Sequence, residues 1–373
     1  MRTVKIRDIL KLEYGKPLDP ADRTPDGKYP AFGANGVKSK TNKFYYDKPS
    51  IIVGRKGSAG ELTLTYEKFW PLDVTYYVTH DDSETDLVYI YYLLKSLDIT
   101  SYARGVKPGI NRNDIYELTI TLPPLTVQRN LGQKLSEAYA RIDETIDLTK
   151  KNILNSSLLK ESAVEEQFGH YVDGDIMSFG DVCEVKGGKR VPKGEKLISV
   201  ATEHPYIRVT DFNKNGGVDT TGLRYVSEGV FSKIKKYTIS NNDVYLSIAG
   251  TIGVTGVIPG ELDGSNLTEN ACKLVPSSAI EQMYLYYFTQ SANFKEQVSA
   301  MVKQSAQPKL ALIRIRQINI PLPSVNEQRR AVANLDHVFN SIDKVIDLQS
   351  DKLRNLQKLK DSMLGQIIVN GVE

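Results

Sequence analysis

Two segments of the chain carry apolar residues at the three- and four-residue spacing of a long helix that packs along a seam. In the first segment these positions are Leu131, Leu135, Ala138, Ile142 and Thr145. In the second they are Ala331, Leu335, Val338, Ile342 and Val345, and the pattern resumes at Leu356, Leu359 and Met363. No proline interrupts either segment. The pattern therefore predicts two helices of roughly 40 residues, each about 60 Å long.

Local signals mark where these helices begin. Pro123 and Pro124 precede the first helix, and Pro321 and Pro323 precede the second, where they end the preceding strand. Ser324 and Glu327 have the spacing of a capping box. The first copy lacks that box, and Thr126 is its candidate cap. Because the chain offers no other long helix, we expect the two seams to pack on each other antiparallel, which would turn the second globular part by half a turn.

The rest of the chain predicts two mixed domains rich in short strands. β-Formers cluster or alternate between glycine, proline and asparagine breaks. In the first domain the predicted strands fall in four segments: 49–57, 62–67, 73–79 and 117–123. A single short helix is expected late in each domain, at 88–97 and 283–292. The fold class is therefore α+β.

The two halves of the chain are a tandem repeat. Lys107-Pro108 aligns with Gln307-Pro308, and Ile146-Asp147-Leu148 with Ile346-Asp347-Leu348, both at an offset of 200. Upstream the offset drifts: Tyr89 pairs with Tyr284, and Gly57 with Gly250. A variable globular part followed by a part of fixed length explains this pattern. The predicted divisions are 1–124, 125–170, 171–323 and 324–373: domain, helix, domain and helix.

Several segments resemble the specificity subunits of type I restriction–modification systems. They are GVKPGINRNDI (105–115) followed by ITLPPLTVQR, QPKLALIRIRQINIPLPSVNEQRR in the second copy, YPAFGANG (29–36), IIVGRKGSAG (51–60) and PYIRVTDF (205–212). The resemblance covers essentially the whole chain. It implies two inverted target-recognition domains on a helical spacer, together reading a bipartite, asymmetric DNA sequence.

The same resemblance implies the partners. Two modification subunits, adenine-N6 methyltransferases that use S-adenosylmethionine, would join this chain, and restriction/translocase subunits, which need Mg²⁺ and ATP, would complete the restriction form. The chain itself would bind no cofactor or metal and would not be an enzyme. For contact with the partner subunits we expect the outward helix faces that recur in both copies: Gln128, Arg129, Gln328, Arg329 and Arg330.

Total charge does not by itself indicate a nucleic-acid binder, because 48 Lys and Arg residues face 45 Asp and Glu, for a net charge of +3. A DNA surface must therefore come from local clusters, where basic and amide side chains in glycine-rich loops suit phosphates and base edges. The candidates in the first domain are Asn35, Lys38, Lys40, Arg55, Lys56, Ser58, Arg104, Lys107 and Arg112. Those in the second are Lys189, Arg190, Arg208, Thr251, Lys303 and Gln304.

Other functional classes find little support. The chain has no phosphate-binding loop motif, no Asn/Asp-Pro-Pro-aromatic methyltransferase site, four dispersed histidines and two scattered cysteines. Its composition and beginning predict a cytoplasmic protein without a membrane span. Asp173 or Asp175 before Glu184-Val185-Lys186 is a weak nuclease-like pattern. Two further alternatives are a specificity subunit of a type II system that cuts on both sides of its site and a duplicated coiled-coil adaptor that does not bind DNA.

Overall fold

The computed structural model describes residues 1–169, 176–213, 215–303 and 309–370, without side chains at 303 and from 365 onward. The chain divides into two compact units, each of which is described by itself. Unit 1 consists of Met1–Lys151 and Gln349–Glu373, and unit 2 of Asn152–Leu348. Each unit thus contains one globular domain and a stretch of both long helices.

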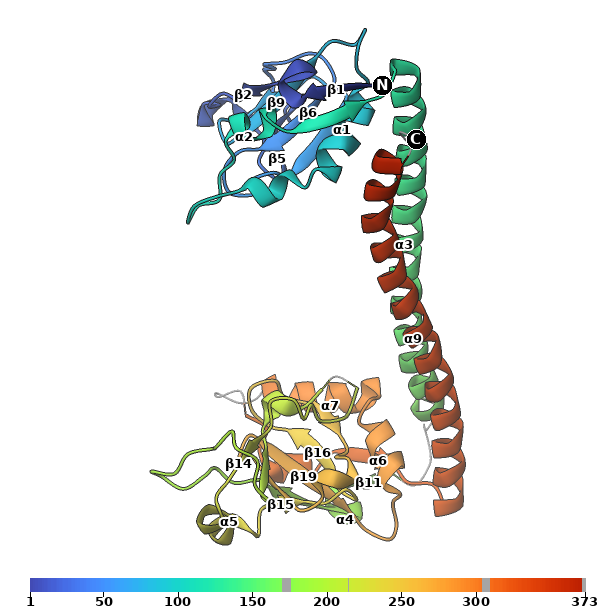
Figure 1. Cartoon of the computed structure of the whole chain (residues 1–373). Helices are drawn as coiled ribbons and strands as arrows, with labels where there is room; N and C mark the ends of the chain where they lie inside the picture. Colours follow the sequence, from blue (N-terminus) through green and yellow to red (C-terminus); the bar gives the residue numbers. More distant parts are fainter. Residues whose placement is uncertain (170–175, 214, 304–308, 371–373) are drawn as a thin grey trace. The chain divides into compact units, whose positions relative to one another are not determined.

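The domain of unit 1 is built around a four-stranded antiparallel sheet of order β2-β9-β6-β7. Its strands are β2 (Leu10–Tyr14), β9 (Thr75–His80), β6 (Ser50–Gly54) and β7 (Leu62–Thr65). Every residue of the central strand β6 is buried. Helix α1 (Leu87–Ser96) packs on this sheet with Tyr89, Ile90 and Leu94 in the core (Figure 1).

Smaller elements complete this domain. A second sheet has the order β3-β5-β4-β8. Its strands are β3 (Arg23–Thr24), β5 (Gly36–Thr41), β4 (Tyr29–Gly33) and β8 (Trp70–Pro71). Strand β1 (Arg2–Lys5) pairs with β10 (Thr119–Leu122), which leads into the first long helix, and α2 (Arg112–Tyr116) lies just before β10.

The domain of unit 2 repeats the main sheet with the order β12-β19-β16-β17. The strands are β12 (Cys183–Gly187), β19 (Ala271–Pro276), β16 (Val244–Ser247) and β17 (Thr255–Gly256). Strand β11 (Ile176–Ser178) pairs with β20 (Asn319–Pro321), as β1 does with β10. The second sheet of this domain differs from the one in unit 1 and has the order β14-β13-β18-β15. Its strands are β14 (Arg224–Tyr225), β13 (Pro205–Ile207), β18 (Ser265–Leu267) and β15 (Thr238–Ile239).

The helices of the second domain correct one prediction. Instead of one late helix, α6 (Gln282–Phe288) ends and α7 (Ala292–Lys303) begins as a separate helix. Three further short helices accompany them: α4 (Phe179–Val182), α5 (Glu228–Ile234) and α8 (Leu312–Ile315). The expectation of a single helix is also wrong in the first domain, where α2 follows α1. Apart from α7, the additional helices span four to seven residues each, too few for hydrophobic periodicity to reveal them.

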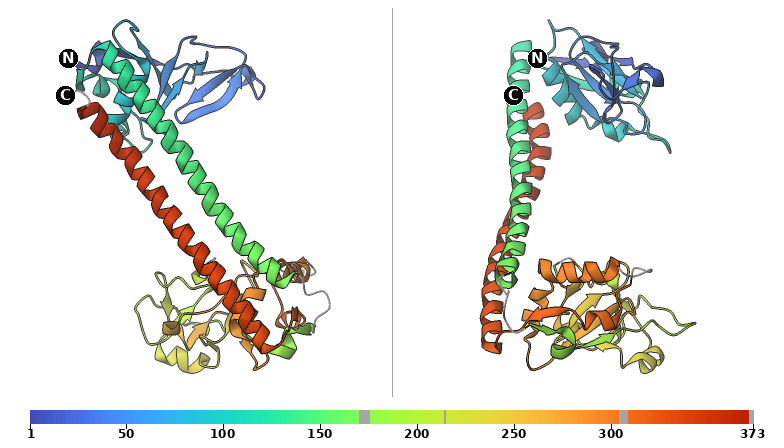
Figure 2. Two further views of the ribbon diagram at one scale, coloured as in Figure 1. Left: turned by 90° about the vertical axis from the view of Figure 1, so that its right-hand side faces the viewer. Right: turned by 180° about the vertical axis from the view of Figure 1, so that it is seen from behind.

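The two long helices are α3 (Leu125–Phe168) and α9 (Val325–Asn370), and each is unbroken in every view (Figures 1 and 2). The Ser324–Glu327 capping box forms as predicted: the Ser324 amide donates to the Glu327 carboxylate over 3.0 Å, and the Glu327 amide donates to the Ser324 hydroxyl over 3.4 Å. Thr126 lies inside the first turn of α3, two residues after the N-cap position at Pro124, so that prediction is wrong.

Within each unit the two helices pack antiparallel. In unit 1 the Tyr139 hydroxyl donates to the Lys360 carbonyl over 2.7 Å, and Leu135 and Leu364 are buried in one core. In unit 2 Lys160 pairs with Asp343, and the Lys160 ammonium lies 4.9 Å from the Phe339 ring centroid. The residues equivalent to these two in the other half of the repeat, at the offset of 200, are Lys360 and Asp143. They form the corresponding ion pair in unit 1.

The seam differs in part from the prediction. Leu135, Ile142, Ala331 and Leu335 are buried, as a seam requires. Val345 and Leu359, however, are exposed, and Tyr139 and Leu364 are buried at positions that the pattern did not include. No helix in the described ranges is long and apolar enough to cross a membrane.

Candidate nucleic-acid interface

Two loops of the first domain, distant in sequence, are hydrogen-bonded to each other. One is the turn Gly54–Gly60 after β6, and the other is the loop Arg104–Gly109 before α2. The Gly57 amide donates to the Pro108 carbonyl over 2.8 Å, and the Ile110 amide donates to the Arg55 carbonyl over 3.0 Å. The structure therefore joins the two most family-like segments of the first half in one surface.

The loop Arg104–Gly109 is a closed hairpin that projects from the domain. Arg104 and Gly109 exchange backbone hydrogen bonds of 2.9 and 3.0 Å. At its tip the Val106 side chain is fully exposed and makes no use of its apolar surface within the domain. An apolar side chain held out by a closed turn between Arg104 and Lys107 is suited to contact with another molecule.

The glycines of the first turn serve two different purposes. A Cβ at Gly54 would lie 2.1 Å from the Ser58 carbonyl oxygen and 2.6 Å from that of Ala34, so the domain's own packing excludes a side chain there. Gly57 has φ +82° with open space around it. No described atom lies where a Cβ of Gly57 would be, so another molecule can approach the backbone closely there, although the Gly57 amide itself already donates to Pro108.

Five cationic side chains lie on these loops and at the start of α2. They are Arg55, Lys56, Arg104, Lys107 and Arg112. The ion pairs of the domain involve other residues, such as Lys43 with Asp22 and Lys5 with Glu117, and none of the five joins a described carboxylate. Unneutralised positive charge on adjoining loops is the electrostatic signature of a phosphate-binding surface.

Two of these cations are held over an aromatic ring that sequence analysis did not select. The Arg55 and Arg112 guanidinium carbons lie 5.3 and 4.7 Å from the ring centroid of Tyr14, which is about half exposed. Tyr14 in turn packs edge-on against Tyr76, with ring centroids 5.0 Å apart. Burial and the neighbouring Tyr14 raise the pKa of Tyr76 to about 12. The sequence pattern predicts no strand at 10–14, so nothing in the sequence marks Tyr14 as part of this surface.

The other candidates of the first domain are spread along or near β4 and β5. Asn35 is exposed and follows Ala34, whose carbonyl lies against Gly54, so Asn35 adjoins the two loops. Ser58 lies within the first turn. Lys38 covers Gly33 with its aliphatic chain, and Lys40 pairs in register with Pro30 farther along β4. Asn35 and Ser58 therefore belong with the loop surface, whereas Lys38 and Lys40 extend along β5.

In the second domain the equivalent turn at Gly250 also meets the segment before a short helix. Ala249 and Lys309 form a bridge, and the Leu310 amide donates to the Ile248 carbonyl over 2.9 Å. Thr251 is exposed in this turn. Two predicted site residues cannot be placed: the Lys303 side chain and the whole of Gln304 lie outside the described residues.

Two arginines of the second domain have internal partners. Arg208 forms hydrogen bonds with the buried Asp211 through two nitrogens and a further one, 2.9 Å long, with the Gly222 carbonyl. Arg190 pairs with Glu269, whereas Lys189 is exposed and lies 5.5 Å from the Tyr237 ring centroid. The contacts of Arg208 indicate a structural role, so it is the weakest of the predicted base or phosphate contacts.

The predicted outward placement of Gln128 and Gln328 is wrong. Both are buried, and both fasten a long helix to its domain. Gln328 donates to the Ala279 and Pro323 carbonyls over 3.0 and 2.9 Å and accepts from the Glu281 amide over 2.9 Å. Gln128 makes the equivalent three bonds in unit 1. The neighbouring Arg129, Arg329 and Arg330 are exposed, and Arg329 pairs with Glu281.

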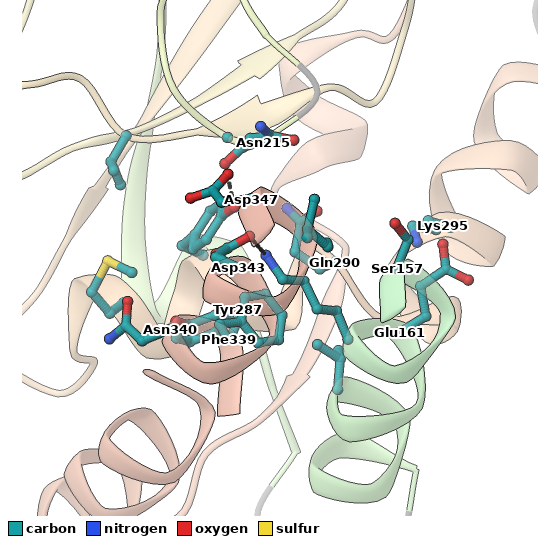
Figure 3. A pocket seen from close by; sticks show the side chains of 17 residues that line it. Ser157, Glu161, Asn215, Tyr287, Gln290, Lys295, Phe339, Asn340, Asp343 and Asp347 are labelled. Atoms are coloured by element: carbon teal, nitrogen blue, oxygen red, sulfur yellow. Dashed lines mark hydrogen bonds and ion pairs between the residues drawn. The ribbon is translucent and has the colours of Figure 1, made fainter. Parts of the chain in front are cut away.

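A cavity of about 710 Å³ in unit 2 lies between the helix pair and the second domain (Figure 3). Its lining comes from α3, α6, α7, α9 and nearby loops, and Asp343, labelled in Figure 3, pairs there with Lys160. Lining charges of both signs, Lys160 and Lys295 against Glu161, Asp343 and Asp347, give it no net preference for an anion. It is the polar space beside the helix–domain contact.

The nuclease-like pattern gains no support. Glu184 pairs with Lys186 on the same strand, which lowers the pKa of Glu184, while Asp173 and Asp175 lie outside the described residues. Within the described ranges no group of three His, Cys, Asp or Glu side chains could hold a metal ion. Cys183 and Cys272 are buried free thiols, and burial raises the pKa of Cys183 to about 12.

A domain that occurs twice, each copy fastened to the same pair of long helices and one of them carrying a cationic two-loop surface, defines a duplicated recognition protein. The chain belongs to the family of type I restriction modification DNA specificity domains, whose model matches residues 1–156 and again 171–350. The two matches correspond to the two halves of the internal repeat.

Named relatives and solved structures agree with this family. The MjaVIII specificity subunit of Methanocaldococcus jannaschii is 22% identical, covering 99% of this chain and 92% of that protein. The EcoBI specificity subunit of Escherichia coli is 26% identical, covering 69% and 59%. A chain from a structure of type I restriction–modification complex assembly and conformational transition matches with a TM-score of 0.77 at 16% identity, covering 98% of this chain and 97% of that one. The HsdS subunit of Thermoanaerobacter tengcongensis matches with a TM-score of 0.61 at 19% identity, covering 98% and 96%.

These findings confirm two predictions. The fold is the expected pair of mixed domains with two long helices. The chain is a type I specificity subunit, and the type II alternative is not favoured.

Proposed function

We propose that this chain selects the DNA target of a type I restriction–modification complex through its two domains, each reading one half of a bipartite sequence. The observation that carries the proposal is the joined two-loop surface of the first domain, with its five unpaired cations and the exposed Val106. Cations in loops around a bare backbone turn supply phosphate contacts, and amide and hydroxyl groups such as Asn35 and Ser58 supply base-edge contacts.

The chain acts in this proposal without chemistry of its own. Two modification subunits and the restriction/translocase subunits bind to it, with Arg129, Arg329 and Arg330 as candidate contacts on the exposed helix faces. S-adenosylmethionine, Mg²⁺ and ATP act in those partners, and double-stranded DNA is the shared substrate of a cytoplasmic complex.

Methylation mapping of the source genome, with and without this gene, tests the proposal. We expect one split motif that carries N6-methyladenine in both halves to disappear on deletion and to return when the gene is restored. The restored gene is the control for effects on neighbouring genes. If co-expression of the chain with its modification subunit leaves a methylation-free genome unmodified, the proposal is wrong, and the adaptor alternative takes its place.

A further inference from the structure

We propose that Tyr14, Arg55 and Arg112 form a preorganised binding site for one DNA backbone phosphate, and that the second domain lacks this site. We call these three residues the two-arginine site. The inference rests on the proposed function, because it assumes that the first domain binds DNA. It goes further by naming the anchoring contact and by making the two domains unequal.

The two arginines are fixed before any ligand binds. The Arg55 Nε and Nη2 donate to the Asp73 carbonyl over 3.1 and 2.5 Å, and the Arg112 Nη1 donates to the Leu12 carbonyl over 2.9 Å. Each guanidinium uses only part of its five N–H donors in this way. The remaining donors have no partner among the described residues, so they are available to an oxyanion without a further loss of side-chain entropy.

The Tyr14 ring stabilises both cations of the site. The negative face of an aromatic ring stabilises a cation within about 6 Å of its centroid, and both guanidinium groups lie within that range. Arg55 also lies 5.9 Å from the Tyr76 centroid. Glu13 and Glu117 line the same cavity as Arg112, but no described carboxylate pairs with either guanidinium, so the two cations can still bind a single anion.

The location of the site favours DNA as the source of that anion. Arg55 belongs to the turn whose Gly57 amide is tied to the projecting loop, and Arg112 begins the helix that follows that loop. Lys56, Arg104 and Lys107 extend the positive charge along the same segments. A phosphate bound here would be one of a row, as on a DNA strand, and the site would set the register of the domain on the duplex.

The second domain has a different set of residues at every equivalent position. Strand pairing aligns Tyr14, opposite Tyr76, with Gly187, opposite Cys272. Equivalent backbone bonds align Arg55 with Ile248, and the constant offset aligns Arg112 with Leu312. A Cβ on Gly187 would lie 3.2 Å from the Leu312 side chain, so the same two positions meet there without charge. Arg316 donates to the nearby Val185 carbonyl over 3.5 Å.

The test measures how salt affects DNA binding by the full chain assembled with its modification subunit. Arg112→Gln is expected to weaken binding to target and non-target DNA by the same factor. It is also expected to reduce the slope of log K against log salt by about 1 between about 50 and 200 mM salt. Arg7→Gln is the matched control. It removes the same charge from the same domain, but at a residue already paired with Glu117, and its slope should equal that of the wild type.

A second measurement locates the phosphate. Methylphosphonate is placed at one position at a time along the target duplex, which removes a single phosphate charge. We expect one position, in the half-site of the first domain, to weaken the wild type and to have no effect on Arg112→Gln. Arg112→Lys keeps the positive charge and should retain most of the salt slope. This result would show that the effect of Arg112→Gln comes from the lost charge and not from misfolding.

The outcomes separate the two proposals. If Arg112→Gln and Arg7→Gln give equal slopes, or if every phosphonate affects Arg112→Gln as it does the wild type, the two-arginine site is wrong while the proposed function stands. If the wild-type complex binds target and scrambled DNA equally, the proposed function itself fails.

Discussion

At the scale of single residues, Gln128 and Gln328 decide how firmly each domain is held to its helix. Each glutamine is buried and makes three hydrogen bonds to backbone groups: two just before a neighbouring helix and one to a proline that precedes its own helix. Gln328→Ala would leave the Glu281 amide and two carbonyls without this partner. Because an unsatisfied buried polar group costs about 1–3 kcal/mol, we expect a destabilisation of about 2 kcal/mol, measured by urea unfolding of the full chain.

The adjacent Arg330 provides the comparison for that prediction. It is exposed on the same turn of α9, and Arg330→Ala is expected to change the free energy of unfolding by no more than about 0.5 kcal/mol. Equal effects of the two substitutions would show that the buried hydrogen bonds do not fasten the helix to the domain.

At the scale of elements, the two long helices begin in different ways, and this difference predicts a pH dependence. Hydrogen bonds from the Ser324 side chain and amide lower the pKa of Glu327. Because the pKa is lower in the folded state, the ionised Glu327 carboxylate stabilises the fold. This stabilisation is complete above the unfolded pKa of about 4.3 and is lost as the pH falls through the folded pKa.

Glu327→Gln should therefore make the stability of unit 2 depend less on pH in the acid range. Hydrogen exchange at the start of α9, followed as a function of pH, measures this. The start of α3, where Val127 replaces Glu327, serves as the internal control. An unchanged acid limb in the variant would contradict this role.

Elements also show what the sequence could and could not predict. The long helices, the capping box and the repeat follow from local spacing, so they could be predicted. The burial of Gln128 depends on contacts with residues 84–86, and the two-arginine site joins positions about a hundred residues apart. Gly132 shows the same limit: a Cβ there would lie 3.1 Å from the Tyr89 amide, so close packing against α1 explains a glycine inside a helix. No periodicity in one segment carries such information.

At the scale of the whole molecule, the division into two units does not follow the order of the chain. The C-terminal part of α9, from Gln349 onward, continues directly from unit 2 but belongs to unit 1. There the Lys360 carbonyl accepts a hydrogen bond from the Tyr139 hydroxyl, and the Lys360 ammonium pairs with Asp143. Leu364 is buried in the same core as Leu135. A chain that ends at Leu348 therefore loses part of the core of the domain that is farthest from it in sequence.

Hydrogen exchange of this truncated chain tests that division. We expect faster exchange in residues 125–151 and in α1, because Tyr139 and the Tyr92 ring, 5.2 Å away, lose the cover of α9. Residues 176–213 and 244–288 should exchange as in the full chain. The double substitution Tyr139→Phe and Lys360→Met, which keeps the helix but removes its polar contacts, should give a smaller effect in the same places. If the truncation instead loosened the second domain first, the end of α9 would belong to the domain beside it in sequence, and each half of the repeat would be complete in itself.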